Sequence, residues 1–565
     1  MRLVTAALFG SMSLIAADPK TICFSTAPNA YLTDHAAEIK KSYDGFFFNG
    51  GSWEDAAKRF VGVNGAKPEA QAWMDEARRN LAALRRAGAT ENFLTILYPG
   101  EGEWPTPERL LSSDYTKHKA EQYAAIGLTA RRLGFRGVCI DIEYPYPRYD
   151  LDNPIYRYEN YTAGQLTKAA HAQGRAVMHA LLDTFPEAVV ILLPGGLRDR
   201  VIPTEYQVGM LETMTERDAP GGFHLGTEFS YYVRDDVTSL ATTRFEDPAP
   251  ALLAGRKVMD YWRRRCSMAP GVWPTHMVET PDRAYPEQPW KKEVEELRRQ
   301  VTVLRSTAKR YIWSYSGAPM WYAYTPEVEQ KYKLTKPKFR LPDIDARDWL
   351  DMLASHPRLE ATSPLQKLVA AIQRYDRGEI SSEQLCDAFG TPGRWWVLGK
   401  MSNLLTKPAF AGMDAPLGRV SEHEIHRGRD GGVRWFRYDN LDPIGITSPR
   451  TIFGFSNVDD SGAHLVTNIH SPEERKAILH FGWDDGARLY LGGKILVDAL
   501  EYPPKGKGMV YKEKFLFEKH IPVTIPKGVT RLAVTTMNLR GKWLYSLRLT
   551  DGDGIPFDDI RFRLE

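Results

Sequence analysis

Two acidic side chains end one of the most apolar segments of this chain. The segment is FRGVCIDIEYP, residues 135–145, and its carboxylates are Asp141 and Glu143. Because side chains alternate along a strand, we expect both carboxylates on one side, about 7 Å apart along the chain. Each negative charge disfavours ionisation of the other, so one of the two is suited to hold a proton and act as a general acid. The pair predicts acid–base chemistry at a strand end.

Aromatic and further acidic residues follow this and other strand-like segments. Flat rings of this kind hold sugar rings, and a carboxylic acid can protonate the oxygen that leaves when a glycosidic bond breaks. A second carboxylate can stabilise the oxocarbenium-like centre of that reaction. The candidate residues after the successive strands are Tyr98, Tyr144, Glu228, Tyr231, Trp273, His276, Trp313, Tyr315 and Trp321. The combination predicts cleavage between sugar rings.

The elements that position these residues alternate between strand and helix patterns. We expect strands at residues 21–25, 45–49, 92–98, 137–143, 188–193, 222–231, 271–278 and 310–315. Helical periodicity occupies residues 68–87, 115–133, 162–184, 249–265 and 290–308. Eight strands separated by helices predict an α/β fold of the (β/α)8 TIM-barrel type, whose chemistry lies at the C-terminal ends of the strands. An open doubly wound sheet is the alternative, but no glycine-rich phosphate loop follows the first strand.

A family resemblance rests on two of these strands. FRGVCIDIEYP resembles the fourth-strand signature DGxDxDxE of the family 18 glycoside hydrolases, the chitinases and their relatives. On that match Glu143 would be the general acid/base, and Asp141 would orient the N-acetyl group of the substrate. YIWSYSG resembles the eighth-strand tryptophan of the family, so Trp313 would form the floor of the −1 sugar subsite. Arg136 and Cys139 depart from the pattern, because the family has aspartates there.

A second catalytic scheme uses carboxylates from different strands. Asp141 or Glu143 would act together with Glu228, or less favourably with Glu279. The separation of the two carboxyl groups would then decide between retention and inversion at the sugar carbon.

Each candidate also has a purely structural interpretation. The acidic pair could form ion pairs with Arg136 or Arg148, since structural ion networks also gather carboxylates. Glu228 could bind a loop amide, and Trp313 could fill the barrel interior. These alternatives remain open at the level of sequence.

The C-terminal part of the chain has a different character. Residues 327–342 are charged and proline-containing, as in a linker, and residues 344–389 are helical. From residue 394 short strands alternate with Gly, Asn and Asp turns, which predicts a β-sandwich. Residues 481–498 read as a hairpin with a Gly-Gly turn, and they resemble the WDDGxxLxxxGxxxxD core of PA14-like and related carbohydrate-binding sandwiches. That resemblance would give Asp484 and Asp485 a role in binding Ca²⁺ and sugar.

Composition and the N-terminus set the broad class. Residues 1–17 have a basic start, a short apolar run and small residues, which predicts a secretory signal peptide. A net charge of +3 without a long basic run disfavours nucleic acid and anionic membranes as partners. Four cysteines are too few for a disulfide scaffold and are expected as buried free thiols. We expect a barrel over residues 18–326, a helical connector over 327–392 and a sandwich over 393–565.

Together these patterns predict a secreted or periplasmic glycoside hydrolase that acts on a carbohydrate and needs no metal or cofactor. The alternative is a catalytically inactive, lectin-like barrel that only binds glycans. A lyase or an esterase would need a base–Tyr pair or a Gly-x-Ser-x-Gly elbow, and the sequence shows neither.

Overall fold

A computed structural model gives the architecture. It describes residues 18–49, 68–97, 106–142, 161–193, 201–228, 230, 256–274, 290–315, 321–322, 325–334, 346–360, 363, 365–402, 420–439, 445–453, 461–484, 486–499, 517, 519–538 and 543–565. All structural statements below refer to these residues.

Eight parallel strands close into one barrel in the order of the sequence. They are β1 (Lys20–Thr26), β2 (Gly45–Asn49), β3 (Phe93–Leu97), β4 (Gly137–Asp141), β5 (Val189–Leu193), β6 (Phe223–Thr227), β7 (Ser267–Val272) and β8 (Tyr311–Ser314). The predicted (β/α)8 fold is confirmed. The seventh strand begins four residues before the predicted 271–278, and the sixth ends at Thr227 rather than at residue 231.

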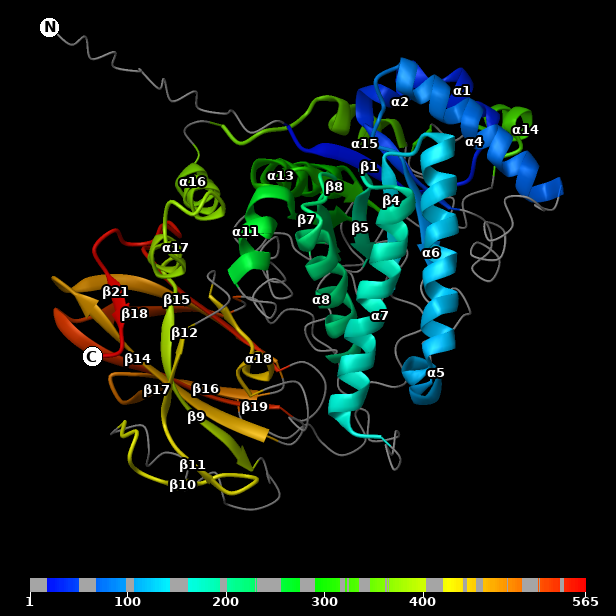
Figure 1. Cartoon of the computed structure of the whole chain (residues 1–565). Helices are drawn as coiled ribbons and strands as arrows, with labels where there is room; N and C mark the ends of the chain where they lie inside the picture. Colours follow the sequence, from blue (N-terminus) through cyan, green and yellow to red (C-terminus); the bar gives the residue numbers. More distant parts are fainter. Residues whose placement is uncertain are drawn as a thin grey trace, which may run out of the picture.

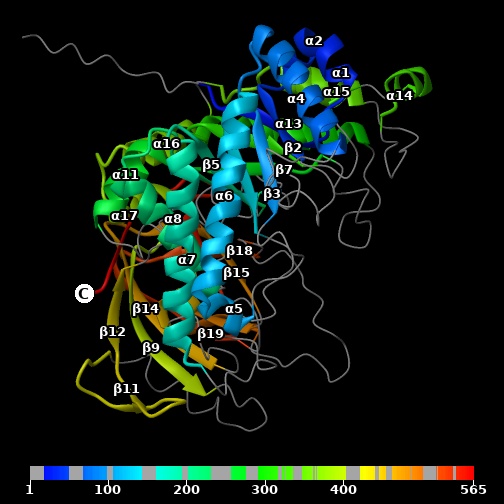
Figure 2. The same cartoon turned by 45° about the vertical axis from the view of Figure 1, so that its right-hand side comes forward.

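Helices surround the barrel, and the long α6, α7 and α8 lie side by side along one flank (Figure 1, Figure 2). The helices of this part are α1 (Ala30–Asp34), α2 (Ala36–Ser42), α4 (Pro68–Arg86), α5 (Pro107–Leu111), α6 (Ser113–Leu133), α7 (Ala163–Thr184), α8 (Val201–Glu216), α11 (Arg256–Arg265) and α13 (Trp290–Thr307). Thr162 and Gln165 form a capping box that starts α7. Glycine allows α7 and α8 to approach closely, because a Cβ on Gly174 would lie 2.1 Å from the Tyr206 carbonyl oxygen.

Alternation along each strand divides the barrel into two apolar layers. On β4, Val138 and Ile140 pack toward the helices, whereas Cys139 belongs to the interior cluster. The interior cluster consists of Ile22, Phe47, Phe93, Cys139, Val189, Ile191, Leu193, Ala269, Tyr311 and Trp313. The barrel is therefore filled by side chains over most of its height, as expected for eight strands.

Two described helices that follow β8 pack on the barrel. Thr325 caps α14 (Pro326–Tyr332), whose first residue is a proline, a favoured position for this residue. In α15 (Ala346–Ala354) the buried Trp349 donates a hydrogen bond from Nε1 to the Tyr43 hydroxyl, at 2.8 Å. Residues 327–342 are predicted as a linker and residues 344–389 as helical. Helix α14 overlaps the first stretch and α15 lies in the second, and Tyr332 and Trp349 pack in the apolar layer of the barrel.

Two further helices connect the barrel to the C-terminal part. These helices are α16 (Leu365–Asp376) and α17 (Ser382–Phe389), and both lie between the barrel and the sandwich in Figure 1. Their apolar residues share one buried cluster with Val303 of α13 and with Ile446 and Leu544 of the C-terminal part. The buried Arg548 donates a hydrogen bond to the Phe389 carbonyl at 2.9 Å. The connector thus packs against both parts of the chain.

The C-terminal part is a β-sandwich of antiparallel strands. The larger sheet has the order β12-β9-β14-β19-β16-β17 with β21 beside β14, the smaller has the order β13-β20-β15-β18, and β10 pairs with β11. The elements are β9 (Arg394–Ser402), β10 (His426–Arg427), β11 (Gly432–Val433), β12 (Phe436–Asp439), β13 (Ile446–Thr447), α18 (Pro449–Phe453), β14 (Ser461–Ser471), β15 (Arg475–Trp483), β16 (Gly486–Leu491), β17 (Lys494–Ala499), β18 (Lys519–Ile525), β19 (Gly528–Asn538), β20 (Tyr545–Thr550) and β21 (Arg561–Arg563). One apolar core joins Val534 of the larger sheet to Leu479 and Leu547 of the smaller.

The predicted hairpin is shorter than the sequence pattern suggested. Strands β16 and β17 pair around Gly492 and Gly493, whose φ values of 56° and 82° are those of a tight hairpin turn. Residues Phe481–Trp483, however, belong to β15 in the other sheet. The chain crosses from one sheet to the other at Asp484, whose backbone N–H donates to the Leu544 carbonyl. Asp485 lies outside the described residues.

A buried histidine makes the stability of the barrel sensitive to acid. His224 is 1% exposed, its Nδ1 lies 2.8 Å from the Ser267 hydroxyl, and Arg310 donates to its Nε2. Burial, with a smaller contribution from the positive charge of Arg310, holds the pKa of His224 well below its usual value of 6.5. The unfolded chain takes up a proton below about pH 6.5 and the folded chain does not, so folding stability must fall as the pH decreases.

This linkage gives a direct prediction. One such histidine lowers the free energy of unfolding by up to about 1.4 kcal/mol per pH unit below pH 6.5. Glutamine cannot titrate in this range. We therefore expect the free energy of unfolding of His224→Gln, measured with urea, to fall less between pH 7 and pH 5 than that of wild type. An unchanged slope in the variant would show that other groups cause the acid sensitivity.

Candidate active site

The inward-facing residues at the C-terminal ends of the strands form a mixed rim of acidic and aromatic side chains. Each follows an inward-facing residue of its own strand in steps of two, so its side chain also points inward, at the mouth of the barrel. These residues are Phe24, Asn49, Thr95, Asp141, Leu193, Glu228, Trp273 and Tyr315. Such a mouth is where barrel enzymes carry out their chemistry.

Asp141 is the buried carboxylate of this rim. It is the last residue of β4, it is 4% exposed, and it lies beside Leu97 and Leu193 in the strand register. Directly below it on the same side is Cys139, which is fully buried. Burial, together with the charge of Asp141, raises the pKa of the Cys139 thiol well above its usual value. The residue beneath Asp141 is therefore neutral, where the family 18 pattern has an aspartate.

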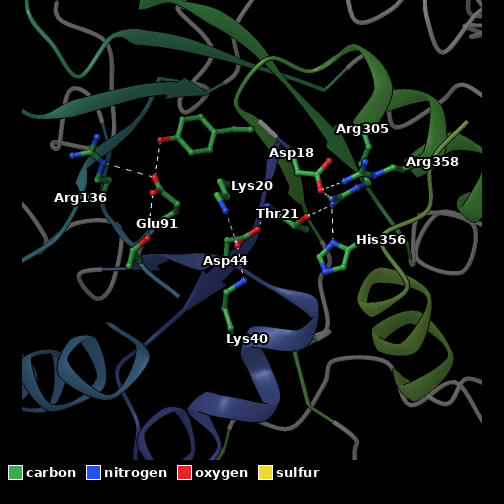
Figure 3. Close-up of polar contacts among 12 residues, drawn as sticks. Asp18, Lys20, Thr21, Lys40, Asp44, Glu91, Arg136, Arg305, His356 and Arg358 are labelled. Atoms are coloured by element: carbon green, nitrogen blue, oxygen red, sulfur yellow. Dashed lines mark hydrogen bonds and ion pairs between the residues drawn. The ribbon is translucent and has the colours of Figure 1, made fainter. Parts of the chain in front are cut away.

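Arg136 cannot act as the ion-pair partner of Asp141. It precedes β4 at the other end of the barrel, about 16 Å away for five residues of strand. There its Nε lies 3.9 Å from Glu91, which also accepts a 2.7 Å hydrogen bond from the Tyr311 hydroxyl (Figure 3). The structural interpretation through Arg136 is thus wrong, and Arg148 lies outside the described residues.

The contacts in Figure 3 belong to the base of the barrel, where the strands begin. Asp44 accepts hydrogen bonds from Lys40 at 2.8 Å and from the backbone N–H of Thr21 at 2.9 Å, and these bonds lower the pKa of its carboxyl group against the opposing effect of burial. Arg305 donates to the Thr21 hydroxyl and to His356. This face of a barrel stabilises the fold.

Glu228 is the second carboxylate of the rim. It follows the last residue of β6, is partly exposed, and continues the inward side of that strand. The next described residue, Ser230, is buried and donates a 2.5 Å hydrogen bond to the Gly271 carbonyl. The Gln300 side chain in turn donates to the Ser230 carbonyl. These bonds anchor the segment that carries Glu228. Only β5 separates β4 from β6, so the strands of the two carboxylates lie about 10 Å apart.

The aromatic residues of the rim lie opposite Asp141. The rings of Trp273 and Tyr315 meet edge to face, with centroids 5.0 Å apart, and the Tyr315 centroid is 5.4 Å from that of Phe24. They come from β7, β8 and β1, and β8 is the strand opposite β4 in an eight-stranded barrel. Trp273 and Tyr315 are both partly exposed. The mouth thus has an acidic half and an aromatic half.

Two predicted sugar-binding tryptophans are buried. Trp313 is 2% exposed, donates from Nε1 to the Ala269 carbonyl at 2.9 Å, and contacts Phe47 inside the barrel. Trp321 is 5% exposed and packs on Tyr31 and Phe46 in the layer between strands and helices. The position of Trp313 matches its alternative role of filling the barrel, and Trp321 lies away from the inward rim.

Other predicted site residues lie outside the described residues. They are Glu143, Tyr98, Tyr144, Tyr231 and His276, together with Glu279. Conversely, sequence reasoning did not select the rim residues Phe24, Asn49 and Thr95. Counting in steps of two from the apolar centre of each strand would have found them.

Three further observations concern the described residues as a whole. No group of three or more His, Cys, Asp or Glu side chains there could hold a metal ion. The four cysteines are buried and free, as predicted. No described helix combines the length and the apolar character needed to span a membrane.

The comparisons with known proteins report distant structural matches. No protein-family model matches the sequence, and neither does any curated protein. A xylanase 10C from Cellvibrio japonicus is 10% identical over 60% of this chain and 71% of its own, with a TM-score of 0.33. A GH18 chitinase from Pseudoalteromonas aurantia is 10% identical over 52% and 94%, with a TM-score of 0.29.

Other neighbours catalyse different chemistry. An old yellow enzyme homologue from Zymomonas mobilis is 13% identical over 57% of this chain and 96% of its own, with a TM-score of 0.29. Sugar-cleaving enzymes are thus among the neighbours, but similarity this weak does not discriminate between functions.

Proposed function

We propose that this chain is a glycoside hydrolase that cleaves its substrate at the C-terminal mouth of the barrel. One observation supports this most directly: the buried Asp141 faces inward at the end of β4, across the mouth from the partly exposed Trp273 and Tyr315. A sugar ring held on the aromatic half would present its glycosidic oxygen to the acidic half. This division of labour is what cleavage of a glycosidic bond requires.

The acidic residues take distinct roles in this proposal. Glu143, two residues after Asp141, protonates the leaving oxygen, and Asp141 supports the positive charge that develops at the sugar carbon. Glu228 is the candidate for a second carboxylate that acts directly on the sugar or on water. The neutral Cys139 leaves the negative charge of Asp141 without an acidic neighbour beneath it.

The function is tested with a panel of aryl glycosides and polysaccharides incubated with the purified protein. Release of sugar from one class of substrate, with a rate proportional to protein concentration, is the expected result. Glycan binding without release would support the lectin-like barrel instead.

Sugar binding by the sandwich and export directed by residues 1–17 belong to the same proposal.

Trp273 is predicted to contribute to substrate affinity rather than to the chemical step. Loss of one aromatic stacking contact costs about 0.5–1.5 kcal/mol, which corresponds to a roughly two- to tenfold higher KM for Trp273→Ala with little change in kcat. Trp273→Phe keeps a flat ring and should restore most of the affinity. Steady-state kinetics on the best substrate of the panel measure both, and equal KM values for wild type and Trp273→Ala would contradict the stacking role.

A further inference from the structure

A pair of histidines faces outward on the smaller sheet of the sandwich. His480 on β15 and His520 on β18 are directly opposite each other in the antiparallel register. Their Nδ1 atoms are 2.7 Å apart and their rings are nearly perpendicular, at 87°. Because Leu479, Phe481 and Ile521 pack on the sandwich core, the two imidazoles lie on the opposite side of the sheet.

The surrounding hydrogen bonds fix the protons on both rings. The Thr550 hydroxyl donates to the Asp551 carbonyl at 2.8 Å, so its oxygen must accept a hydrogen bond from His480. His480 Nε2 lies 2.8 Å from that oxygen and therefore carries the proton of this ring. His480 Nδ1 is then a bare lone pair, and the hydrogen between the two rings belongs to His520 Nδ1.

A small change turns this pair into two metal ligands. His520 is exposed, so its proton can move from Nδ1 to Nε2, where solvent accepts the hydrogen bond. The Nδ1 atoms of both rings then offer a lone pair to the same point, and neither ring has lost a proton. Metal–nitrogen bonds of about 2.0–2.1 Å place two neighbouring ligand atoms roughly 2.9–3.4 Å apart. The present 2.7 Å reaches that range with a slight rotation of the His520 ring.

We propose that His480 and His520 chelate a divalent transition-metal ion of the Zn²⁺, Cu²⁺ or Ni²⁺ class. Imidazole nitrogen selects these ions over Mg²⁺ and Ca²⁺, which prefer oxygen. Thr550 acts as the partner that orients the ligand, as hydrogen-bond acceptors do for metal-bound histidine. The remaining coordination positions are filled by water, which makes the ion exchangeable. The proposal does not depend on the function of the barrel.

The nearby cations moderate the affinity of this site without blocking it. Arg548 is the register neighbour of His480 on β20, but its guanidinium group donates to the carbonyl oxygens of Phe389 and Gly554. Lys519 extends over the Trp483 ring, at 5.8 Å from its centroid. A bound ion would join the edge strand β18 to β15 and thereby stabilise the sandwich.

Calorimetric titration of the full-length protein with ZnCl₂, and separately with MgCl₂, tests the proposal. We expect one Zn²⁺ site per chain in the wild type, loss of that site in His520→Ala, and about tenfold weaker binding in Thr550→Val. His470→Ala is the matched control, since His470 is a single histidine of the same domain that bonds to a carbonyl oxygen, and it should bind like wild type. Equal Zn²⁺ affinity in wild type and His520→Ala, or equal affinity for Mg²⁺, overturns the proposal.

Thermal unfolding gives an independent readout. Saturating Zn²⁺ should raise the Tm of wild type and of His470→Ala but not that of His520→Ala. Because His520 is exposed and its removal deletes one hydrogen bond, the metal-free Tm should change only slightly, so that loss of binding in this variant reports on ligation. An equal Tm increase in His520→Ala would place the ion elsewhere and overturn the assignment.

Discussion

Replacing Glu143 by Gln is expected to lower kcat by two or more orders of magnitude, and Asp141→Asn should have an effect of similar size. Glutamine keeps the shape of the side chain but cannot supply a proton to the leaving oxygen, and general acid catalysis contributes about 10²- to 10⁴-fold. Asparagine at position 141 fits the same buried site but removes the negative charge that faces the mouth. Both variants are measured on the best substrate of the glycoside panel.

The control and the alternative partner are included in the same experiment. Asp114→Asn removes an exposed carboxylate from the first turn of α6, outside the barrel, and should keep wild-type kcat and KM. A loss in Glu228→Gln as large as that in Glu143→Gln would support the scheme with carboxylates on two strands. Full activity in both Asp141→Asn and Glu143→Gln would refute the proposed site.

The barrel could be predicted because its signals are local. The apolar centres of β2, β4 and β5 are bounded by turns and are buried on both faces, so they appear as continuous apolar runs. Alternation then predicts that Asp141 lies on the same side of β4 as Cys139, which the structure places in the barrel interior. This inference depends only on the geometry of a single strand.

The start of the seventh strand could not be predicted in this way. The strand Ser267–Val272 contains Pro270, and a proline within an apolar run argues against a central strand because it donates no hydrogen bond. In the structure, Pro270 is paired only with Thr227, the last residue of β6, so the missing donor lies at the end of that ladder. Whether a proline is tolerated at this position depends on where β6 ends, and the sequence of β7 alone does not predict that.

The sequence also does not predict how deep in the barrel a side chain lies. Trp313 and Tyr315 face the same side of β8, and their sequence context does not distinguish a filling residue from a rim residue. The register of the closed barrel does, because it pairs Trp313 with Ile22, near the middle of β1, and with Gly271, two residues before the rim residue Trp273. Tyr315 lies two residues further toward the C-terminal mouth. Depth is a property of eight strands together.

Depth also gives opposite expectations for Trp313, inside the barrel, and Trp273, on its rim. Trp313→Ala removes a 2% exposed indole that contacts Phe24 and Phe47, and it should lower the free energy of unfolding by about 3–5 kcal/mol. Trp273→Ala removes a partly exposed side chain and should cost less than about 1 kcal/mol while raising KM. Urea unfolding of both variants beside wild type measures the contrast. If Trp313→Ala instead kept the stability of wild type and lost substrate affinity, Trp313 would be the floor of a sugar subsite. That result would contradict its role in filling the barrel interior.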